Sequence, residues 1–314
     1  MQLSLRALRY FVAAADAGGV TPAAGAMRVS QPSISAAIAQ LESQLGIQLF
    51  VRHHARGLTL TAAGERLLAE ARSLLAHARE LEAFAGNMGQ AQRGDLSAGC
   101  FVTLAPFLMP GLIAAFNQHY PDVRIQTEEG NQAELFEQLR SGRCELAFSY
   151  AYGLTEEFEA TVLAELAPQV IVSKQHALAT RRSVRLHELE NEPLILLDLP
   201  HTREYFQSLF QRANIKPRIA QRTRSYEMVR ALAAHGLGFG VLNAIPRMPY
   251  TYEGQAVVAI PIADDLPGVQ VVCLRLKRAL TRPAVNLLAD FAQDHVAKLW
   301  RATASRNTRR LKKK

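Results

Sequence analysis

Short polar side chains gather along one edge of a predicted helix near the beginning of the chain. Ser30 can cap this helix, and Pro32 suits its first turn because proline has no N–H group to leave unpaired. Serine and glutamine side chains hydrogen-bond to base edges and phosphates, and they enter a major groove without a steric or charge penalty. We expect this helix to contact DNA through Ser30, Gln31, Pro32, Ser33, Ser35 and Gln40.

The opposite edge of the same helix is apolar, as a buried face requires. Its members lie at helical spacing: Ile34, Ile38, Leu41 and Leu45. A shorter helix precedes it, and we expect that helix to begin with Thr21 as N-cap and Pro22 in the first position. Two helices joined by a tight turn form a helix-turn-helix, which places its second helix in a major groove.

Two short apolar strands follow Gly46, with a turn predicted at residues 54–57. Arg52 and Arg56 fall on this hairpin, where guanidinium groups can meet phosphates or a minor groove. A helix pair followed by a hairpin predicts a winged helix-turn-helix over residues 1–60. The paired histidines at positions 53 and 54 have no cysteine or carboxylate at ligand spacing, so we expect no metal site there.

Residues 21–64 resemble the DNA-binding segment of the LysR-type transcriptional regulators. The matching residues keep their order and spacing over about forty residues, which makes the signal more specific than a lone short motif. They are Ala23-Ala24, Ser30-Gln31-Pro32, Ser35, Leu41-Glu42, Gly46, Leu49-Phe50, Arg52, Leu60-Thr61 and Gly64. Chain length and layout also match, so the resemblance covers nearly the whole chain. It implies a transcriptional regulator that binds double-stranded DNA, is controlled by a small-molecule effector and forms a homodimer or homotetramer.

The chain departs from the family pattern at Gly19, Pro22 and Ala36-Ala37. Ala36 lacks the longer side chain that reaches bases or phosphates in relatives. Base recognition is therefore expected to depend on Gln31, Pro32 and the hairpin.

Residues 61–92 predict a linker helix that pairs with a second copy. Apolar residues repeat about every 3.5 positions, a spacing typical of paired helices. They are Leu67, Ala71, Leu74, Ala78, Leu81, Ala85 and Met88. We expect Leu67, Leu74 and Leu81 to face a partner subunit; the alternative is a single helix packed on its own domain.

From Asp95 onward, strands and helices alternate, which predicts an α/β domain with parallel sheets. We expect an effector-binding domain over 93–300, with lobe I at about 93–162 and 267–300 and lobe II at about 163–266. A basic tail over 301–314 follows. Two lobes joined by two crossings resemble the effector domain of the same family, which is like a periplasmic binding protein.

Ligands of such folds lie between the lobes at the carboxyl ends of strands. Helix N-termini with nearby hydroxyl groups suit an anion, and the family resemblance implies a small effector that carries a carboxylate. The expected contacts are Phe101, Val102, Thr103, Phe148, Tyr150, Asp198, His201, Thr202 and Ser225. The alternative is that Thr103, Thr202 and Ser225 serve only as helix caps.

The net charge of +8 does not by itself indicate a DNA-binding domain. Residues 295–314 carry eight basic residues and no acid, so the rest of the chain is neutral overall. This tail can bind nucleic acid non-specifically, but a disordered, solvated end is the simpler explanation. The three scattered cysteines indicate buried, reduced thiols, with a redox switch as the alternative.

Several functions are not supported by any motif. The glycines at 236, 238 and 240 follow a predicted helix and precede a strand, the reverse of a dinucleotide fingerprint. We expect no catalytic residues, cofactor, metal or membrane segment, and a cytoplasmic location. Two other functions remain open: a DNA-binding protein whose second domain only oligomerises, and a binding-protein-like enzyme with an added DNA-binding domain.

Overall fold

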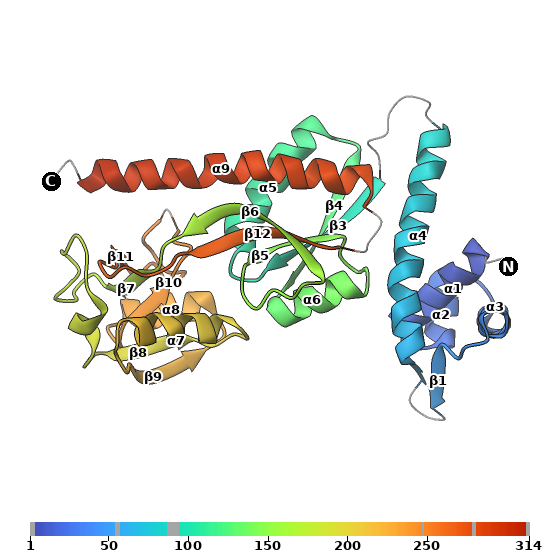
Figure 1. The fold of residues 1–314 in the computed structure, drawn as a ribbon, viewed down its shortest axis with the longest axis horizontal. Helices are drawn as coiled ribbons and strands as arrows, with labels where there is room; N and C mark the ends of the chain where they lie inside the picture. Colours follow the sequence, from blue (N-terminus) through green and yellow to red (C-terminus); the bar gives the residue numbers. More distant parts are fainter. Residues whose placement is uncertain (1–3, 54–56, 87–93, 247, 278–280, 312–314) are drawn as a thin grey trace.

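The computed structural model describes residues 4–53, 57–86, 94–246, 248–277 and 281–311. Of residues 52, 53, 80–86 and 301–311 it describes the backbone alone. The chain forms an N-terminal unit, a long linker helix and two α/β lobes (Figure 1). No helix in the described part of the chain has the length and apolar character needed to span a bilayer.

The N-terminal unit comprises three helices and a two-stranded antiparallel hairpin. Its elements are α1 (Leu5–Asp16), α2 (Val20–Met27), α3 (Gln31–Leu45), β1 (Phe50–His53) and β2 (Gly57–Leu60). The predicted apolar edge of α3 is confirmed, since Ile34, Ile38 and Leu41 are at most 2% exposed. The predicted start of α2 is wrong. Gly19 is the N-cap and Pro22 lies in the first turn, where the N–H that proline lacks would have no partner in the helix anyway.

The linker helix α4 (Ala62–Gly86) packs along α1. Its Leu68, Ala71 and Leu75 are buried in the core of the N-terminal unit, beside Leu8 and Phe11. Ala71 was expected on a face shared with a second copy, but it packs on its own chain. The alternative of a helix packed on its own domain is therefore correct for one face of α4.

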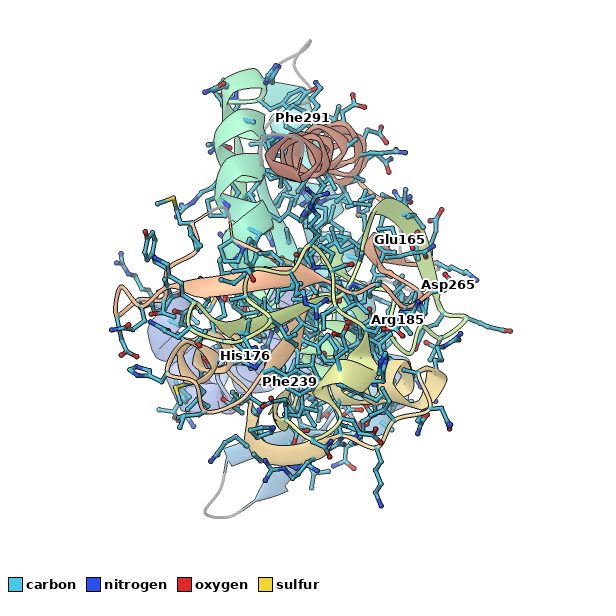
Figure 2. All side chains as sticks on the ribbon, turned by 90° about the vertical axis from the view of Figure 1, so that its left-hand side faces the viewer. Glu165, His176, Arg185, Phe239, Asp265 and Phe291 are labelled. Atoms are coloured by element: carbon cyan, nitrogen blue, oxygen red, sulfur yellow. The ribbon has the colours of Figure 1, made fainter. Side chains whose placement is uncertain are left out.

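Lobe I is built on a five-stranded sheet in the order β4-β3-β5-β12-β6. Its strands are β3 (Gly94–Phe101), β4 (Val123–Gly130), β5 (Leu146–Tyr150), β6 (Phe158–Leu166) and β12 (Val269–Leu276). Helices α5 (Ala105–His119) and α9 (Pro283–Leu311) lie on one face, and α6 (Gln132–Arg140) lies on the other (Figure 1). Phe291 fills the gap between α5 and α9, where its ring is 5.4 Å from that of Phe116 (Figure 2).

Lobe II comprises two small sheets, whose orders are β10-β7-β11 and β8-β9. Its elements are β7 (Gln169–Ser173), a 3-10 turn (Leu186–Leu189), β8 (Pro193–Leu197), α7 (Thr202–Arg212), β9 (Arg218–Thr223), α8 (Tyr226–Ala234), β10 (Gly240–Leu242) and β11 (Val257–Pro261). Phe239 lies in the core of this lobe, against Phe210 (Figure 2).

The expectation of parallel sheets is confirmed for β3 with β4 and β5 and for β8 with β9, but it is wrong for the other strand pairs of the two lobes. Strand β12 runs antiparallel to β5 and β6, and β7 runs antiparallel to β10 and β11. The reason is that the chain crosses between the lobes twice, after β6 and again before β12. A strand that returns from the other lobe enters the sheet from the opposite end and so pairs antiparallel.

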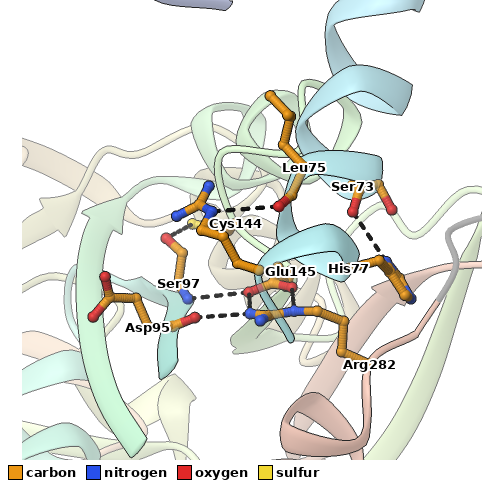
Figure 3. A network of polar contacts seen from close by, with 9 residues as sticks. Ser73, Leu75, His77, Asp95, Ser97, Cys144, Glu145 and Arg282 are labelled. Atoms are coloured by element: carbon orange, nitrogen blue, oxygen red, sulfur yellow. Dashed lines mark hydrogen bonds and ion pairs between the residues drawn. The ribbon is translucent and has the colours of Figure 1, made fainter. Parts of the chain in front are cut away.

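The end of lobe I nearest α4 is held by a partly buried ion pair between Arg282 and Glu145. Arg282 donates from Nε to Oε1 of Glu145 at 2.6 Å and from Nη2 to the carbonyl oxygen of Asp95 at 2.8 Å. Figure 3 shows α4 passing beside this pair, at Ser73 to His77. The linker helix therefore lies against lobe I as well as against the N-terminal unit.

Candidate functional site

The first turn of α3 presents the expected polar edge to solvent. Ser30 caps the helix through its side-chain oxygen, which accepts from the N–H of Ser33. Of the other expected contacts, Ser35 is half-buried. The exposed ones are Gln31, Pro32, Ser33 and Gln40. This edge is free to enter a groove.

The hairpin is fixed to α3 by a single carboxylate. Oε1 of Glu42 accepts from the backbone N–H groups of Leu49 at 2.8 Å and Phe50 at 3.2 Å. Gly64, at the start of α4, passes so close that a Cβ there would lie 2.2 Å from the carbonyl oxygen of Leu49. The side chain of Arg52 and the whole of Arg56 lie outside the described residues.

Among the described side chains of the linker helix, one large apolar residue is open to solvent. Leu74 is 42% exposed, whereas Leu67 packs partly against the N-terminal core. The side chain of Leu81 is outside the described part of the chain. Of the three expected dimer contacts, Leu74 is the one whose described side chain is free to meet a second copy.

A cavity of about 240 Å³ opens where the two lobes meet. Lobe I contributes the ends of β3 and β4 and the first turn of α6, and lobe II contributes the segments after β8 and β9. Its lining residues are Val102, Glu129, Gly130, Asn131, Glu134, Leu199 and Arg224. Asn131 and Glu134 also form the predicted capping box of α6, which is confirmed by the bonds between them.

Thr103 follows Val102, which lines this cavity on the lobe I side. It is 7% exposed and its side chain is hydrogen-bonded to Tyr150, whose ring packs against Phe101 at 5.3 Å. Burial raises the pKa of Tyr150 well above its ordinary value, so its hydroxyl stays protonated. Thr103 makes no capping bond, since α5 begins at Ala105 after Leu104.

Thr202 is the first residue of α7 and is 3% exposed. Its Oγ1 is one of two buried side-chain oxygen or nitrogen atoms without a hydrogen-bond partner in the described part of the chain. The preceding residue, His201, has a left-handed backbone and approaches Gly153 of lobe I, where a Cβ would lie 2.8 Å from its Nδ1. Thr202 does not cap α7, so the helix-cap alternative fails for both threonines.

Three other expected contacts have different roles. Phe148 is fully buried in the middle of β5, between β3 and β12. The carboxylate of Asp198 is already paired, with Arg203 at 3.1 Å and Arg222 at 3.3 Å. Ser225 caps α8 by accepting from Met228, so for this residue the helix-cap alternative is correct.

Aromatic residues that the sequence did not single out occupy much of the space between the lobes. The ring of Tyr152 lies 5.4 Å from that of Tyr150 and 5.2 Å from that of Tyr205 on α7. On the other side, Phe107 of α5 meets Tyr226 of α8 at 5.6 Å. Alternation of aromatic and small residues after a strand was the available signal, but core packing produces the same pattern.

The three cysteines are buried, as expected of structural thiols. Burial raises the pKa of both Cys144 and Cys273 to about 12 and that of Cys100 further still. Among the described residues, no group of three or more His, Cys, Asp or Glu side chains is placed to hold a metal ion. The site is therefore built from hydroxyl groups, aromatic rings and a few charges.

Comparisons with known proteins match both halves of the chain. Residues 5–65 match the family model for the "Bacterial regulatory helix-turn-helix protein, lysR family", and residues 89–297 match the "LysR substrate binding domain". The crystal structure of HinK, a LysR family transcriptional regulator from Pseudomonas aeruginosa, is 36% identical with a TM-score of 0.64, covering 94% of this chain and 99% of HinK.

Two further relatives extend the match. YnfL, an uncharacterized HTH-type transcriptional regulator of Escherichia coli strain K12, is 33% identical over 84% of this chain and 89% of its own length. The structure of full-length CbnR complexed with its target DNA is 25% identical with a TM-score of 0.63, covering 93% of this chain and 99% of CbnR.

Proposed function

The chain belongs to the LysR family of bacterial transcriptional regulators, and we propose that its effector binds between the lobes at Thr202 and Thr103. It is a DNA-binding regulator with an effector-binding domain, not an enzyme. The observation that carries the proposal is the buried, unpartnered hydroxyl of Thr202 at a helix N-terminus. An unsatisfied buried hydroxyl costs about 1–3 kcal/mol, and a ligand that accepts its hydrogen bond removes that cost.

The charges around the cavity favour a small effector with one carboxylate. Arg224, on the lobe II side, supplies a guanidinium that can pair with a carboxylate. Glu129 and Glu134 lie across from it, on the lobe I side, and would repel a second negative charge. Phe101 is fully buried against Tyr150, so contacts from Val102, Tyr150 and His201 would surround the body of the ligand.

The aromatic packing supports a second candidate function. Tyr150, Tyr152 and Tyr205 fill space that a larger ligand would need. A lobe interface closed by its own side chains would suit a domain that only oligomerises. Two observations favour the effector-binding function instead. The cavity lined by Leu199 is open, and the hydroxyl of Thr202 has no partner among the described residues.

For DNA we propose that α3 enters the major groove, with Gln31 near base edges, and that Ser35 and Arg52 contact phosphates. The exposure of the α3 edge supports this assignment. We further propose that Leu74 pairs α4 with a second copy, giving a homodimer or homotetramer that binds an inverted repeat. The proposed division of the chain is 1–60, 61–92 and 93–300, with a basic tail at 301–314, and the proposed location is the cytoplasm.

Mapping the genomic sites that the purified protein binds tests the function directly. We expect inverted repeats upstream of a small set of genes. The substrates and products of the enzymes they encode, presented as carboxylates and as their amides, then serve as ligands in thermal unfolding. A carboxylate that raises Tm and changes operator affinity supports the proposal. Specific DNA binding that no metabolite alters would favour the oligomerisation-only function.

A further inference from the structure

One arginine joins three parts of the molecule that lie far apart in sequence. Arg72, on α4, donates from Nη1 to the carbonyl oxygen of Ser141 at 2.5 Å, and its Nη2 pairs with the carboxylate of Asp16. Asp16 ends α1 of the N-terminal unit, and Ser141 is the C-cap of α6 in lobe I. The Arg72 side chain is 13% exposed and that of Asp16 is 52% exposed, so the bond to Ser141 is partly shielded from water and the pair with Asp16 lies at the surface.

The backbone next to Ser141 is shaped to lie against α4. Gly142 has a φ of +63°, a conformation that favours glycine. A Cβ at this position would lie 3.1 Å from the carbonyl oxygen of Ala69 and 3.3 Å from Cβ of Arg72. The contact between lobe I and the linker helix therefore rests on close backbone packing as well as on the Arg72 hydrogen bond.

The other end of α6 lies in the cleft. Asn131 and Glu134 line the cavity, and the fully buried Gln132 is held on both sides of its amide. Its Nε2 donates to the carbonyl oxygen of Tyr152 at 3.0 Å, and its Oε1 accepts from Ser149 at 2.5 Å. A helix of nine residues is about 13 Å long, so one short rigid element reaches from the cleft to Arg72.

We propose that Arg72 is a positioning residue that transmits the state of the cleft, through α6, to the N-terminal unit of the same subunit. The proposal rests on the proposed function, because an effector bound in the cleft is what would displace the first turn of α6. A displacement of that turn changes the position of Ser141 and Gly142, and so changes how well Arg72 can bind Asp16 and Ser141 together. The Arg72 contacts then differ in free energy between the two states, as a coupling requires.

Two variants break this junction from opposite sides. Arg72→Met removes the guanidinium and keeps the apolar stem, and Gly142→Ala places a methyl group in the narrow gap beside Ala69. Each has a matched control. Arg79→Met removes an arginine of the same helix whose Nε bonds to Leu75 of that helix. Gly254→Ala imposes the same backbone strain at a φ of +79° with nothing within 4 Å.

Hydrogen exchange on the full-length protein reports on the junction without any effector. We expect Arg72→Met and Gly142→Ala to raise exchange about tenfold at the C-terminal turns of α1 and α6, which corresponds to about 1.4 kcal/mol at 25 °C. Neither control should do so. Wild-type protection in both junction variants would overturn the proposal. If Arg72→Met loosens the whole N-terminal unit, the exchange of Asp16→Asn tests the junction instead, since this variant weakens one bond and leaves the packing intact.

The coupling itself requires a perturbation at the cleft end. Ser149→Ala removes the hydrogen bond to Gln132, and we expect it to change affinity for a mapped operator about threefold. In an Arg72→Met background that change should disappear, giving a non-additive double-mutant cycle. Additive effects would overturn the path through Arg72. Should the wild-type protein bind no specific DNA, the proposed function fails, while the exchange measurements still decide whether Arg72 holds the junction.

Discussion

The hydroxyl of Tyr205 accepts a hydrogen bond from Nδ2 of Asn243 at 2.8 Å, and together these two residues hold both chain crossings between the lobes. Nδ2 of Asn243 also donates to the carbonyl oxygen of Leu166, at the end of β6. The Tyr205 hydroxyl donates to the carbonyl oxygen of Pro267, just before β12. Any opening of the lobes must therefore act on this pair, because both connecting segments are bonded to it.

Tyr205→Phe should loosen the crossings while keeping the ring contact with Tyr152. Losing the hydroxyl removes two hydrogen bonds, which should lower the free energy of unfolding in urea by about 1–2 kcal/mol. Small-angle scattering should show a larger radius of gyration. Tyr252→Phe is the control, since that residue is 88% exposed. Equal behaviour of the two variants would show that the Tyr205 hydroxyl does not restrain the lobes.

Gln31 and Arg52 should differ in how they contribute to DNA binding. Gln31→Ala should cost about 1–3 kcal/mol at particular base pairs, because a glutamine side chain hydrogen-bonds to base edges. Arg52→Ala should weaken binding to all sequences alike and lower the salt slope by about one. Fluorescence anisotropy on a mapped operator and on base-substituted copies measures both. Arg124→Ala on β4 controls for loss of charge. An operator affinity that neither Gln31→Ala nor Arg52→Ala changes would contradict the assignment of α3.

Leu74 should be needed for assembly and not for folding of the subunit. Because it is 42% exposed, Leu74→Asp adds a charge that a single subunit tolerates. In a paired helix the same charge is buried without a partner, which is strongly unfavourable. Light scattering should report a lower mass than the wild type, and combining it with Leu81→Asp should complete the dissociation. Leu237 is an exposed residue of lobe II, so Leu237→Asp should leave the mass unchanged. A wild-type mass for Leu74→Asp as well as for this control would rule out the α4 pairing.

The thiols should be unreactive in the folded protein. With the pKa of Cys144 and Cys273 raised to about 12 and that of Cys100 higher, the thiolate fraction at pH 8 is very small. Ellman's reagent should label none of the three within minutes, and all three in denaturant. Rapid labelling at pH 8, or peroxide-dependent operator binding, would restore the redox-switch alternative.

Local sequence patterns predicted the features that depend only on residues close together in the sequence. The capping box at Asn131 and Glu134 and the apolar edge of α3 depend on residues three or four apart, and both are present. Strand β11 was not predicted, since it is short and is fixed by pairing with β7 across the lobe. The sequence also did not predict that Ala71 and Leu74 lie on different surfaces of α4. A 3.5-residue apolar repeat does not indicate whether the same chain or a second copy covers each face.

The cleft was harder to predict than the fold. Thr103 and Thr202 were identified from their positions after strands, which is a local signal. Tyr205, Asn243 and Arg72 were missed because their roles depend on residues far away in the chain, at Pro267, Leu166 and Ser141. A polar residue with a distant partner leaves no periodic trace, so its role is visible only once the chain is folded.

Thr202→Val should separate effector binding from stability. Valine keeps the shape of threonine and removes a buried hydroxyl that has no partner among the described residues, so the free energy of unfolding should stay the same or rise by about 1 kcal/mol. Thr103→Val instead removes a hydrogen bond to Tyr150 and should lower stability by about 0.5–1.5 kcal/mol. Both should bind operator normally without effector, since neither residue lies in the N-terminal unit.

The same two variants should need more effector than the wild type. Losing one hydrogen bond to a charged group costs about 1.5–3 kcal/mol, or roughly 10- to 150-fold in affinity. A reporter dose-response with the identified metabolite should shift to higher concentration and still reach the wild-type maximum, because the two protein states are unchanged. Ser225→Ala is the control, as its hydroxyl caps α8. If Thr202→Val gained stability and kept a wild-type dose-response, the hydroxyl would be an unpaired group of the fold, and the effector would have to bind elsewhere.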